Sequence, residues 1–222
     1  MDHLLILGSC GGSRETYWIA RENWPGAVIL FVDDVSELRE LSLAETVVPV
    51  VKDWDFSRFA ALPSRPITFR YFVPGMGDPR VKKVATEKAL SRGLEPAPPL
   101  ISRQAIVRPD SRVGPGSVIH PTSLVTSNVT VGAFVTIHSA RVGHDAVLRD
   151  YVTCNPGCNV AGHVVLAEGV NLGAWTVVRQ RLAVAPWTVT GMQACVVKEV
   201  LQPNQTLVGV PARPMRDGTG KT

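Results

Sequence analysis

Two different hydrophobic periods divide the chain. From His3 to about Gly93, short apolar runs alternate with stretches in which apolar residues recur every three or four positions. Short apolar runs are typical of buried strands, and the longer spacing is typical of amphipathic helices. We therefore predict a small parallel α/β unit of the Rossmann-like kind in this half. After the proline-rich segment 94–100, which we predict to be a linker, the spacing becomes six.

The first half divides into predicted strands and helices. The strands are expected at residues 3–8, 26–34, 46–51 and 67–73, and the helices at 13–23 and 78–93. Ser13 is in a favourable N-cap position for the first helix, and Gly93 is a suitable terminator for the second. The loop "LGSCGGSRE" connects the first strand to the first helix, where backbone amides favour an anion.

The second half repeats every six residues. Aliphatic residues mark the repeat at Val107, Val113, Ile119, Val125, Val131, Ile137, Val142, Leu148, Val160, Leu166, Leu172, Val178, Val184 and Val196. Cys154 and Thr190 occupy two further marker positions. A helix repeats every 3.6 residues and a strand every two, so neither explains the pattern. The period predicts a solenoid of about five coils, each with three flat faces.

The repeat shortens once. Ile137 and Val142 are five residues apart, and the sequence "VGHD" with His144 and Asp145 follows at once. A local departure from a regular pattern has to be compensated by its surroundings, which makes it a candidate for a functional position.

These motifs resemble a known family. The repeat, the "VGHD" sequence and the ending "TLVGVPARPM" are similar to the left-handed β-helix of hexapeptide-repeat sugar O/N-acyltransferases, such as sialic acid O-acetyltransferases and the bacillosamine and perosamine N-acetyltransferases. The resemblance implies an acceptor-binding α/β domain over residues 1–100, an all-β left-handed parallel β-helix over 101–202, and a tail over 203–222. It also implies a homotrimer that uses acetyl-CoA or another acyl-CoA.

The resemblance assigns His144 as the general base. It would deprotonate an amine or hydroxyl of a sugar or nucleotide-linked sugar, which attacks the thioester directly. A free histidine has a pKa near 6.5, which suits proton transfer at neutral pH. Asp145 would fix the imidazole tautomer. Because successive strand residues point to opposite faces, Asp145 reaches His144 only where the backbone bends.

The resemblance also implies two sets of binding residues. Those expected to contact acyl-CoA are Gly162, whose amide would stabilise the thioester oxygen, and Gly173, Ala174, Lys198, Gly209 and Pro211. Those expected to contact the acceptor are Gly8, Gly11, Gly12, Asp33, Asp34, His138 and Thr153. Cys10 and Gly12 depart from the usual glycine-loop pattern, so the identity of the acceptor stays open. The sequence also leaves open which acyl group is transferred and whether the product is an amide or an ester.

Two alternatives stay open. A zinc-dependent γ-carbonic-anhydrase-like enzyme shares the solenoid, but zinc in that class needs three converging histidines. Arg149 and Tyr151 occupy positions where that class carries a histidine and a cysteine, and guanidinium is not a ligand at ordinary pH. We therefore expect no metal. The second alternative is a catalytically inactive trimeric scaffold.

The composition adds few constraints. Lys and Arg exceed Asp and Glu by four, without a basic cluster, so nucleic acid is not an expected partner. No apolar run approaches the roughly 20 residues of a membrane span, and the amino terminus lacks a signal-peptide pattern. The four cysteines lack a zinc-type spacing and are expected to be reduced. A cytoplasmic location is therefore expected.

Overall fold

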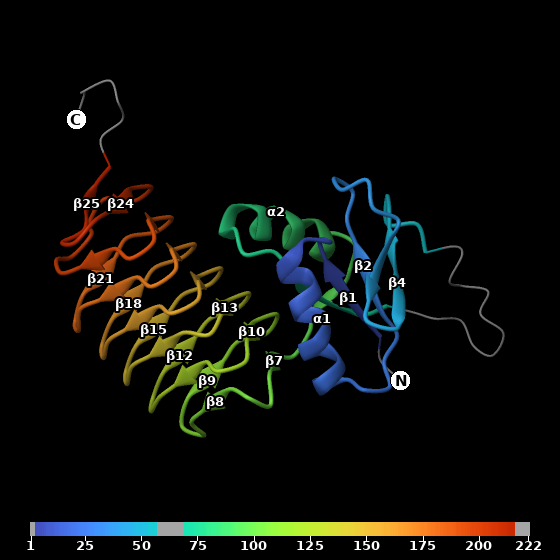
Figure 1. Cartoon of the computed structure of the whole chain (residues 1–222), viewed down its shortest axis with the longest axis horizontal. Helices are drawn as coiled ribbons and strands as arrows, with labels where there is room; N and C mark the ends of the chain where they lie inside the picture. Colours follow the sequence, from blue (N-terminus) through green and yellow to red (C-terminus); the bar gives the residue numbers. More distant parts are fainter. Residues whose placement is uncertain (1–2, 57–68, 216–222) are drawn as a thin grey trace.

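The computed structural model describes residues 3–56 and 69–215 of the chain. An α/β domain is followed by a parallel β-helix (Figure 1). The α/β domain contains β1 (Leu4–Leu7), α1 (Gly11–Asn23), β2 (Ile29–Val32), β3 (Glu40–Leu43), β4 (Thr46–Val51), β5 (Tyr71–Pro74), α2 (Pro79–Leu90) and β6 (Glu95–Pro96). Its sheet has the order β3-β4-β2-β1-β5-β6, and the pairs are parallel except for β3 with β4. The predicted parallel α/β unit is confirmed.

Three local predictions in this domain need correction. The α1 helix begins at Gly11, with Cys10 as an N-cap residue whose side chain makes no capping hydrogen bond to the backbone of the helix, so Ser13 lies buried inside the helix. The sequence missed the antiparallel strand β3. Segment 94–100 is not a free linker, because β6 extends the sheet beside β5. Residues 67 and 68 of the predicted strand 67–73 lie outside the described residues.

The β-helix has three parallel faces, confirming the solenoid predicted from the period of six. The first face holds β7 (Leu100–Ile101), β10 (Val118–Ile119), β13 (Thr136–Ile137), β16 (Thr153–Cys154), β19 (Asn171–Leu172), β22 (Val189–Thr190) and β24 (Thr206–Val208), with the antiparallel β25 (Arg213–Pro214) at its end. The second holds β8 (Ile106–Val107), β11 (Leu124–Val125), β14 (Arg141–Val142), β17 (Asn159–Val160), β20 (Val177–Val178) and β23 (Cys195–Val196). The third holds β9 (Arg112–Val113), β12 (Thr130–Val131), β15 (Val147–Leu148), β18 (Val165–Leu166) and β21 (Ala183–Val184).

The markers of the repeat form the core of the β-helix. Ile137, Val142 and Leu148, one from each face, are all fully buried. Parallel pairing continues through β24, beyond residue 202 where the sequence placed the end of the solenoid. Burial of one aliphatic side chain per six residues is therefore what holds the coils together.

Corners of the β-helix use left-handed backbone. Residues with positive φ recur every six positions, as at Thr122 (φ 62°), Asn128 (φ 56°) and Phe134 (φ 57°). After β13 the corner contains three residues, 138–140, whereas the corner after β10 contains four, 120–123. The missing residue of the repeat is therefore absorbed at the corner that contains Ser139 (φ 47°).

Helix α2 docks the α/β domain onto the β-helix through a buried lysine. Lys82 is fully buried, and its Nζ donates hydrogen bonds to Phe134 O, Thr136 Oγ1 and Thr153 Oγ1, each at 3.0 Å. Burial lowers the pKa of Lys82 to about 7. All three acceptors are uncharged, so the positive charge of the lysine has no contacting counter-ion in this network.

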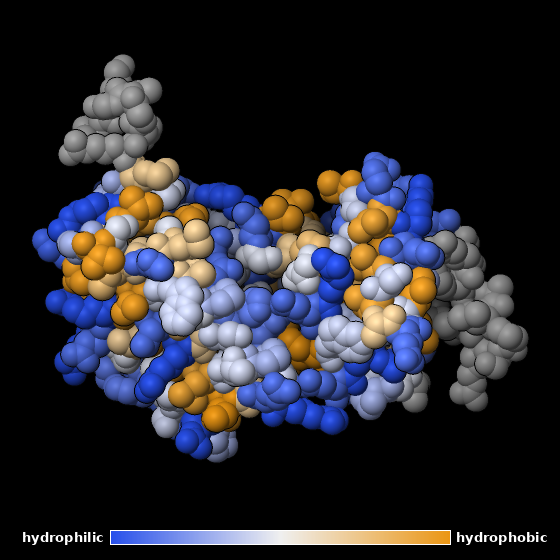
Figure 2. Space-filling view, in the orientation of Figure 1, coloured by the Kyte–Doolittle hydropathy of each residue, from blue (hydrophilic) through white to orange (hydrophobic). Residues whose placement is uncertain are grey.

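The surface of the two halves is mixed. Figure 2 shows hydrophobic patches on both halves of one face, interspersed with hydrophilic surface. On the β-helix, Trp175 and Met192 are 66% and 78% exposed. Within the described ranges, no helix combines the length and the hydropathy needed to cross a membrane.

Candidate active site

His144 and Asp145 form a hydrogen-bonded pair at the corner between β14 and β15. The distance from His144 Nδ1 to Asp145 Oδ2 is 2.7 Å. Asp145 has a φ of 60°, so the backbone turns there and the carboxylate is directed back at the preceding imidazole. Strand alternation, which would separate the two side chains, does not apply at this corner. The bend belongs to the regular corner geometry of the β-helix and not to the shortened corner that contains Ser139.

Asp145 has further partners on the neighbouring coils. Asn128 Nδ2 donates to Asp145 Oδ1 at 2.6 Å, and His163 Nε2 lies 3.5 Å from Asp145 Oδ2. Hydrogen bonds from His144 and then Asn128 hold the pKa of the Asp145 carboxyl below its usual range. The carboxylate therefore stays ionised at neutral pH and can stabilise positive charge on an adjacent imidazole.

Gly162 lies against the His144 ring. A Cβ built on Gly162 would lie 2.6 Å from His144 Cε1, which leaves no room for a side chain. The Gly162 carbonyl accepts a hydrogen bond from Arg181 N, but its N–H has no acceptor among the described residues. This amide is therefore available, beside the imidazole, to a ligand.

A separate cavity of about 560 Å³ lies in the α/β domain. It is lined by Leu7, Gly8, Ser9, Cys10, Val32, Asp33, Asp34, Val35, Trp54, Met76, Arg80, Val81, Val84, Ala85 and Lys88. Gly8, Asp33 and Asp34, expected to contact the acceptor, are thus brought together. Gly11 and Gly12 begin α1 beside the cavity but do not line it. At Gly12 a Cβ would lie 2.7 Å from Gly75 O, so this glycine permits close packing of backbone.

The two acids of this cavity are already engaged by the protein. Asp33 accepts hydrogen bonds from Ser9, Val35 and Ser36. Burial opposes its ionisation, but these bonds outweigh that effect and lower the pKa of Asp33. Asp34 accepts from Asp53 N, Trp54 Nε1 and Lys88 Nζ, which outweigh burial and lower the pKa of Asp34. Both acids therefore organise the walls of the cavity.

Three residues that line the cavity were not predicted from the sequence. They are one aromatic residue, Trp54, and two basic residues, Arg80 and Lys88. Lys88 and Arg92 both lie over the Trp54 ring, at 6.0 and 4.8 Å from its centroid. The ring edge is fixed by Asp34 Oδ2 at 3.1 Å. Nothing in the local sequence around Trp54 marks it, because its partners are 20 and more residues away.

His138 lies in a different cluster, with Glu15 and His120. Glu15 Oε2 is 3.1 Å from His138 Nε2 and 3.7 Å from His120 Nδ1. The two rings stack, with centroids 4.2 Å apart and planes 27° apart. Burial, and then His138, lower the pKa of His120 to about 3, so it is neutral at physiological pH.

Two histidine clusters bring potential ligand atoms together. Both groups place three ligand-type atoms within 4.8 Å of one another. In the first cluster, His138 Nε2 and His120 Nδ1 lie 3.1 and 3.7 Å from the same Glu15 oxygen, Oε2, so the carboxylate bridges the two rings. In the other cluster, the 2.7 Å contact between His144 and Asp145 is a hydrogen-bond distance. We therefore interpret both as hydrogen-bonding and acid–base groups.

The structure buries Thr153, which we expected to face the acceptor. The side chain is 1% exposed, accepts from Lys82 Nζ and donates to Gly77 O at 2.7 Å. The Thr153 hydroxyl therefore donates one hydrogen bond and accepts another where α2 docks. Because the side chain is buried there, it is not exposed to a sugar acceptor.

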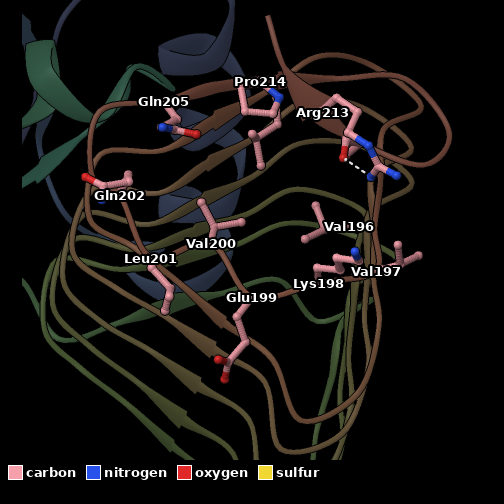
Figure 3. A pocket seen from close by; sticks show the side chains of 12 residues that line it. Val196, Val197, Lys198, Glu199, Val200, Leu201, Gln202, Gln205, Arg213 and Pro214 are labelled. Carbon is pink, nitrogen blue, oxygen red and sulfur yellow. Dashed lines mark hydrogen bonds between the residues drawn. The ribbon is translucent and has the colours of Figure 1, made fainter. Parts of the chain in front are cut away.

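Apart from Gly162, the residues expected to bind acyl-CoA lie in two regions. Gly173 and Ala174 follow β19, where a Cβ on Gly173 would lie 2.4 Å from Thr190 O. Lys198 lines a cavity of about 310 Å³ at the far end of the β-helix, with Arg213 on the same side and Gln202 and Gln205 opposite (Figure 3). Gly209 (φ 89°) and Pro211 follow β24 nearby but do not line this cavity.

Comparisons with known proteins agree with this arrangement. No protein-family model matches the chain. GDP-perosamine N-acetyltransferase of Escherichia coli O157:H7 is 29% identical over 170 residues, which are 73% of this chain and 72% of that protein. The acetyltransferase domain of PglB from Neisseria gonorrhoeae, solved with acetyl coenzyme A, is 26% identical with a TM-score of 0.78, covering 96% of this chain and 99% of that one.

The fold is shared with a further solved structure. A histidine-to-asparagine variant of perosamine N-acetyltransferase from Caulobacter crescentus, in complex with CoA and GDP-perosamine, has a TM-score of 0.83 at 22% identity. The match covers 98% of both chains. In its repeat, its histidine–aspartate pair and its fold, this chain is therefore similar to the hexapeptide-repeat sugar N-acetyltransferases with a left-handed β-helix.

Proposed function

We propose that this chain transfers an acyl group, acetyl in the simplest case, from acyl-CoA to a sugar or nucleotide-linked sugar. The observation that carries the proposal is the 2.7 Å pair of His144 and Asp145 beside the unpaired amide of Gly162. The Escherichia coli relative is named for GDP-perosamine, which supports a nucleotide-linked amino sugar as the first acceptor to test. We place the reaction in bacterial surface-polysaccharide biosynthesis.

The geometry suggests the order of bond changes. Asp145 occupies Nδ1 of His144, which leaves Nε2 to take the proton from the acceptor amine or hydroxyl. The acceptor lone pair attacks the thioester carbon, and the Gly162 N–H stabilises the negative charge that develops on its oxygen. The new C–N or C–O bond forms, the C–S bond breaks, and the CoA thiolate takes the proton back from the imidazolium.

We further propose that the site is completed in a cytoplasmic homotrimer. The acceptor cavity is lined by residues of the α/β domain, whereas His144 lies at a corner of the β-helix and does not line it. An acceptor held in one subunit would reach the His144 of a neighbouring subunit. Exposed apolar side chains such as Trp175 and Met192 are suited to the contact between subunits.

The two alternatives have less support. Arg149 and Tyr151 occupy two positions that a zinc hydratase would use, and Tyr151 is instead buried and stacked on Phe134 with centroids 5.2 Å apart. An inactive scaffold would not require the Asp145 carboxylate to face His144.

The deciding experiment is a thiol-release assay with acetyl-CoA and a panel of amino sugars and nucleotide sugars. Transfer that requires both substrates, from a protein whose mass in light scattering is that of a trimer, is the expected result. Binding of neither CoA nor any acceptor, with no turnover, would favour the scaffold. Zinc in the purified protein together with CO₂ hydration would favour the hydratase.

A further inference from the structure

The Asp145 carboxylate is held from both sides by side chains of the neighbouring coils. Asn128 precedes it by one coil and His163 follows it by one coil, at equivalent corners of the β-helix. We infer that Asn128 and His163 are positioning residues that fix Asp145 against His144, and this inference rests on the proposed role of His144 as the base. Neither side chain has to touch a substrate for this role.

Asn128 determines which way the carboxylate is rotated. Its Nδ2 donates to Oδ1 at 2.6 Å, while His144 Nδ1 contacts Oδ2 at 2.7 Å. With each oxygen assigned to a different partner, rotation about the last side-chain bond of Asp145 would break two hydrogen bonds. Asp145 is 34% exposed, so without Asn128 water would compete for the freed oxygen.

The backbone explains how Asn128 comes to be there. Asn128 and Asp145 both occupy left-handed corner positions, with φ of 56° and 60°. Asn and Asp tolerate this conformation better than other residues with side chains. Asn128 is itself oriented by its N–H, which donates to Asp110 Oδ2 at 3.2 Å. The corner geometry therefore stacks the amide directly on the carboxylate of the next coil.

His163 supports the pair from the other side. Its Nε2 lies 3.5 Å from Asp145 Oδ2, and its ring stands perpendicular to that of His144 with centroids 5.1 Å apart. Its backbone N–H donates to His144 O at 2.9 Å, which ties the two coils together. His163 therefore restricts both the carboxylate and the plane of the catalytic imidazole.

The charged groups near the carboxylate are few. His144 lies at the same corner, His163 lies one coil after it, and Asp110 lies two coils before it, behind Asn128. One further coil on, Arg181 N donates to Gly162 O at 3.0 Å. Removal of Asn128 or His163 therefore removes a group that favours the ionised form of Asp145, and in each case its pKa should rise.

The test compares Asn128→Gly and His163→Gln with the control Thr122→Gly. Glycine suits the left-handed corner, and Thr122 occupies an equivalent conformation (φ 62°) at a corner far from Asp145 in sequence. Carbon-13 NMR of the Asp145 carboxyl gives its pKa, and steady-state kinetics give kcat and KM separately. Asn128→Gly should raise the Asp145 pKa and lower kcat by about tenfold, with little change in KM for acetyl-CoA. His163→Gln should act in the same direction and less strongly, and Thr122→Gly should change neither quantity.

The two readouts separate this inference from the proposed function. An Asp145 pKa that is unchanged in both variants overturns the inference, whatever the kinetics. A raised pKa with an unchanged kcat also overturns it, provided that His144→Gln is inactive. If His144→Gln retains full turnover, the proposed function has failed, and the pKa alone then decides whether Asn128 and His163 hold the carboxylate. Asn128→Asp, which opposes two carboxylates, should raise the Asp145 pKa further than Asn128→Gly.

Discussion

Gly162 lies so close to the His144 ring that no residue with a side chain fits at position 162 unless the ring moves. A Cβ on Gly162 would lie 2.6 Å from Cε1 and 2.7 Å from Nε2 of the His144 ring. Real Cβ contacts are not that short, so any side chain at this position has to displace the imidazole. The proposed base and the proposed oxyanion amide are thus packed against each other on adjacent coils.

Gly162→Ala should therefore lose turnover with little loss of stability. The added methyl displaces the exposed His144 ring from its present position while the buried aliphatic core is untouched. We expect kcat to fall by at least about tenfold, because small misplacements of catalytic groups are costly. The matched control is Gly77→Ala, since nothing lies within 4 Å of the position where that Cβ would be. Equal kcat in the two variants would contradict the close contact.

His144→Ala should reduce turnover by roughly 10²–10⁴-fold, the usual contribution of a general base. Binding of CoA, followed by calorimetry, should be nearly unchanged, because the expected CoA contacts lie at other corners. Asp145→Asn should reduce turnover less, since the imidazole remains but the carboxylate that stabilises its charged form is lost. Wild-type turnover in His144→Ala would remove the histidine from the mechanism.

Lys82→Met should remove a pH dependence of stability. Burial lowers the pKa of Lys82 to about 7 in the folded protein, from its ordinary value of 10.5. Between these two values the unfolded chain binds more protons than the folded one. The free energy of unfolding should therefore rise with pH from about 7 to about 10.5, by at most about 1.4 kcal/mol per pH unit from this group.

Urea unfolding of wild type and Lys82→Met at pH 6.5, 8 and 9.5 measures this effect. The difference in unfolding free energy between the two proteins should change steadily over that range, in favour of wild type as the pH rises. A constant difference would mean that Lys82 titrates normally. Lys83→Met is a suitable control, because Lys83 is the neighbouring lysine of α2 and pairs with Glu168 at the surface.

Trp54→Ala should weaken acceptor binding selectively. The indole forms part of the wall of the 560 Å³ cavity and is fixed by Asp34, with Lys88 and Arg92 over its ring. We expect KM for the acceptor to rise by roughly tenfold or more, as for loss of a large aromatic contact, and KM for acetyl-CoA to stay the same. Trp18→Ala is the control, since Trp18 is an exposed tryptophan of the same domain that does not line the cavity. A rise in both KM values would indicate a general disruption instead.

Much of the fold was predictable because it repeats. Val125, Val131 and Ile137 follow the six-residue rule, and each is buried as the rule requires. The ends of elements were less predictable. The α1 helix begins at Gly11, before the predicted cap Ser13, and it has no side-chain cap. Ser13 instead packs against Gly75. The antiparallel strand β3 was missed because its pairing with β4 depends on a short turn between weakly patterned segments.

The candidate site was predictable in its centre and not in its surroundings. The pair of His144 and Asp145 was visible as a motif, but its orientation depends on the φ of 60° at Asp145. Partners from other coils, such as Asn128 and His163, are not adjacent in the sequence, and only the stacking of corners brings them together. The burial of Thr153 likewise depends on where α2 docks.

The sequence by itself determined the solenoid and the α/β domain and marked His144 as the proposed base, because a strict period and a local motif are properties of neighbouring residues. Tertiary structure decided which side chains surround that base and which line the acceptor cavity, because those contacts join residues one coil or one domain apart. The direction of the Asp145 carboxylate illustrates the division: its position is read from the sequence, and its partners are set by the coils on either side.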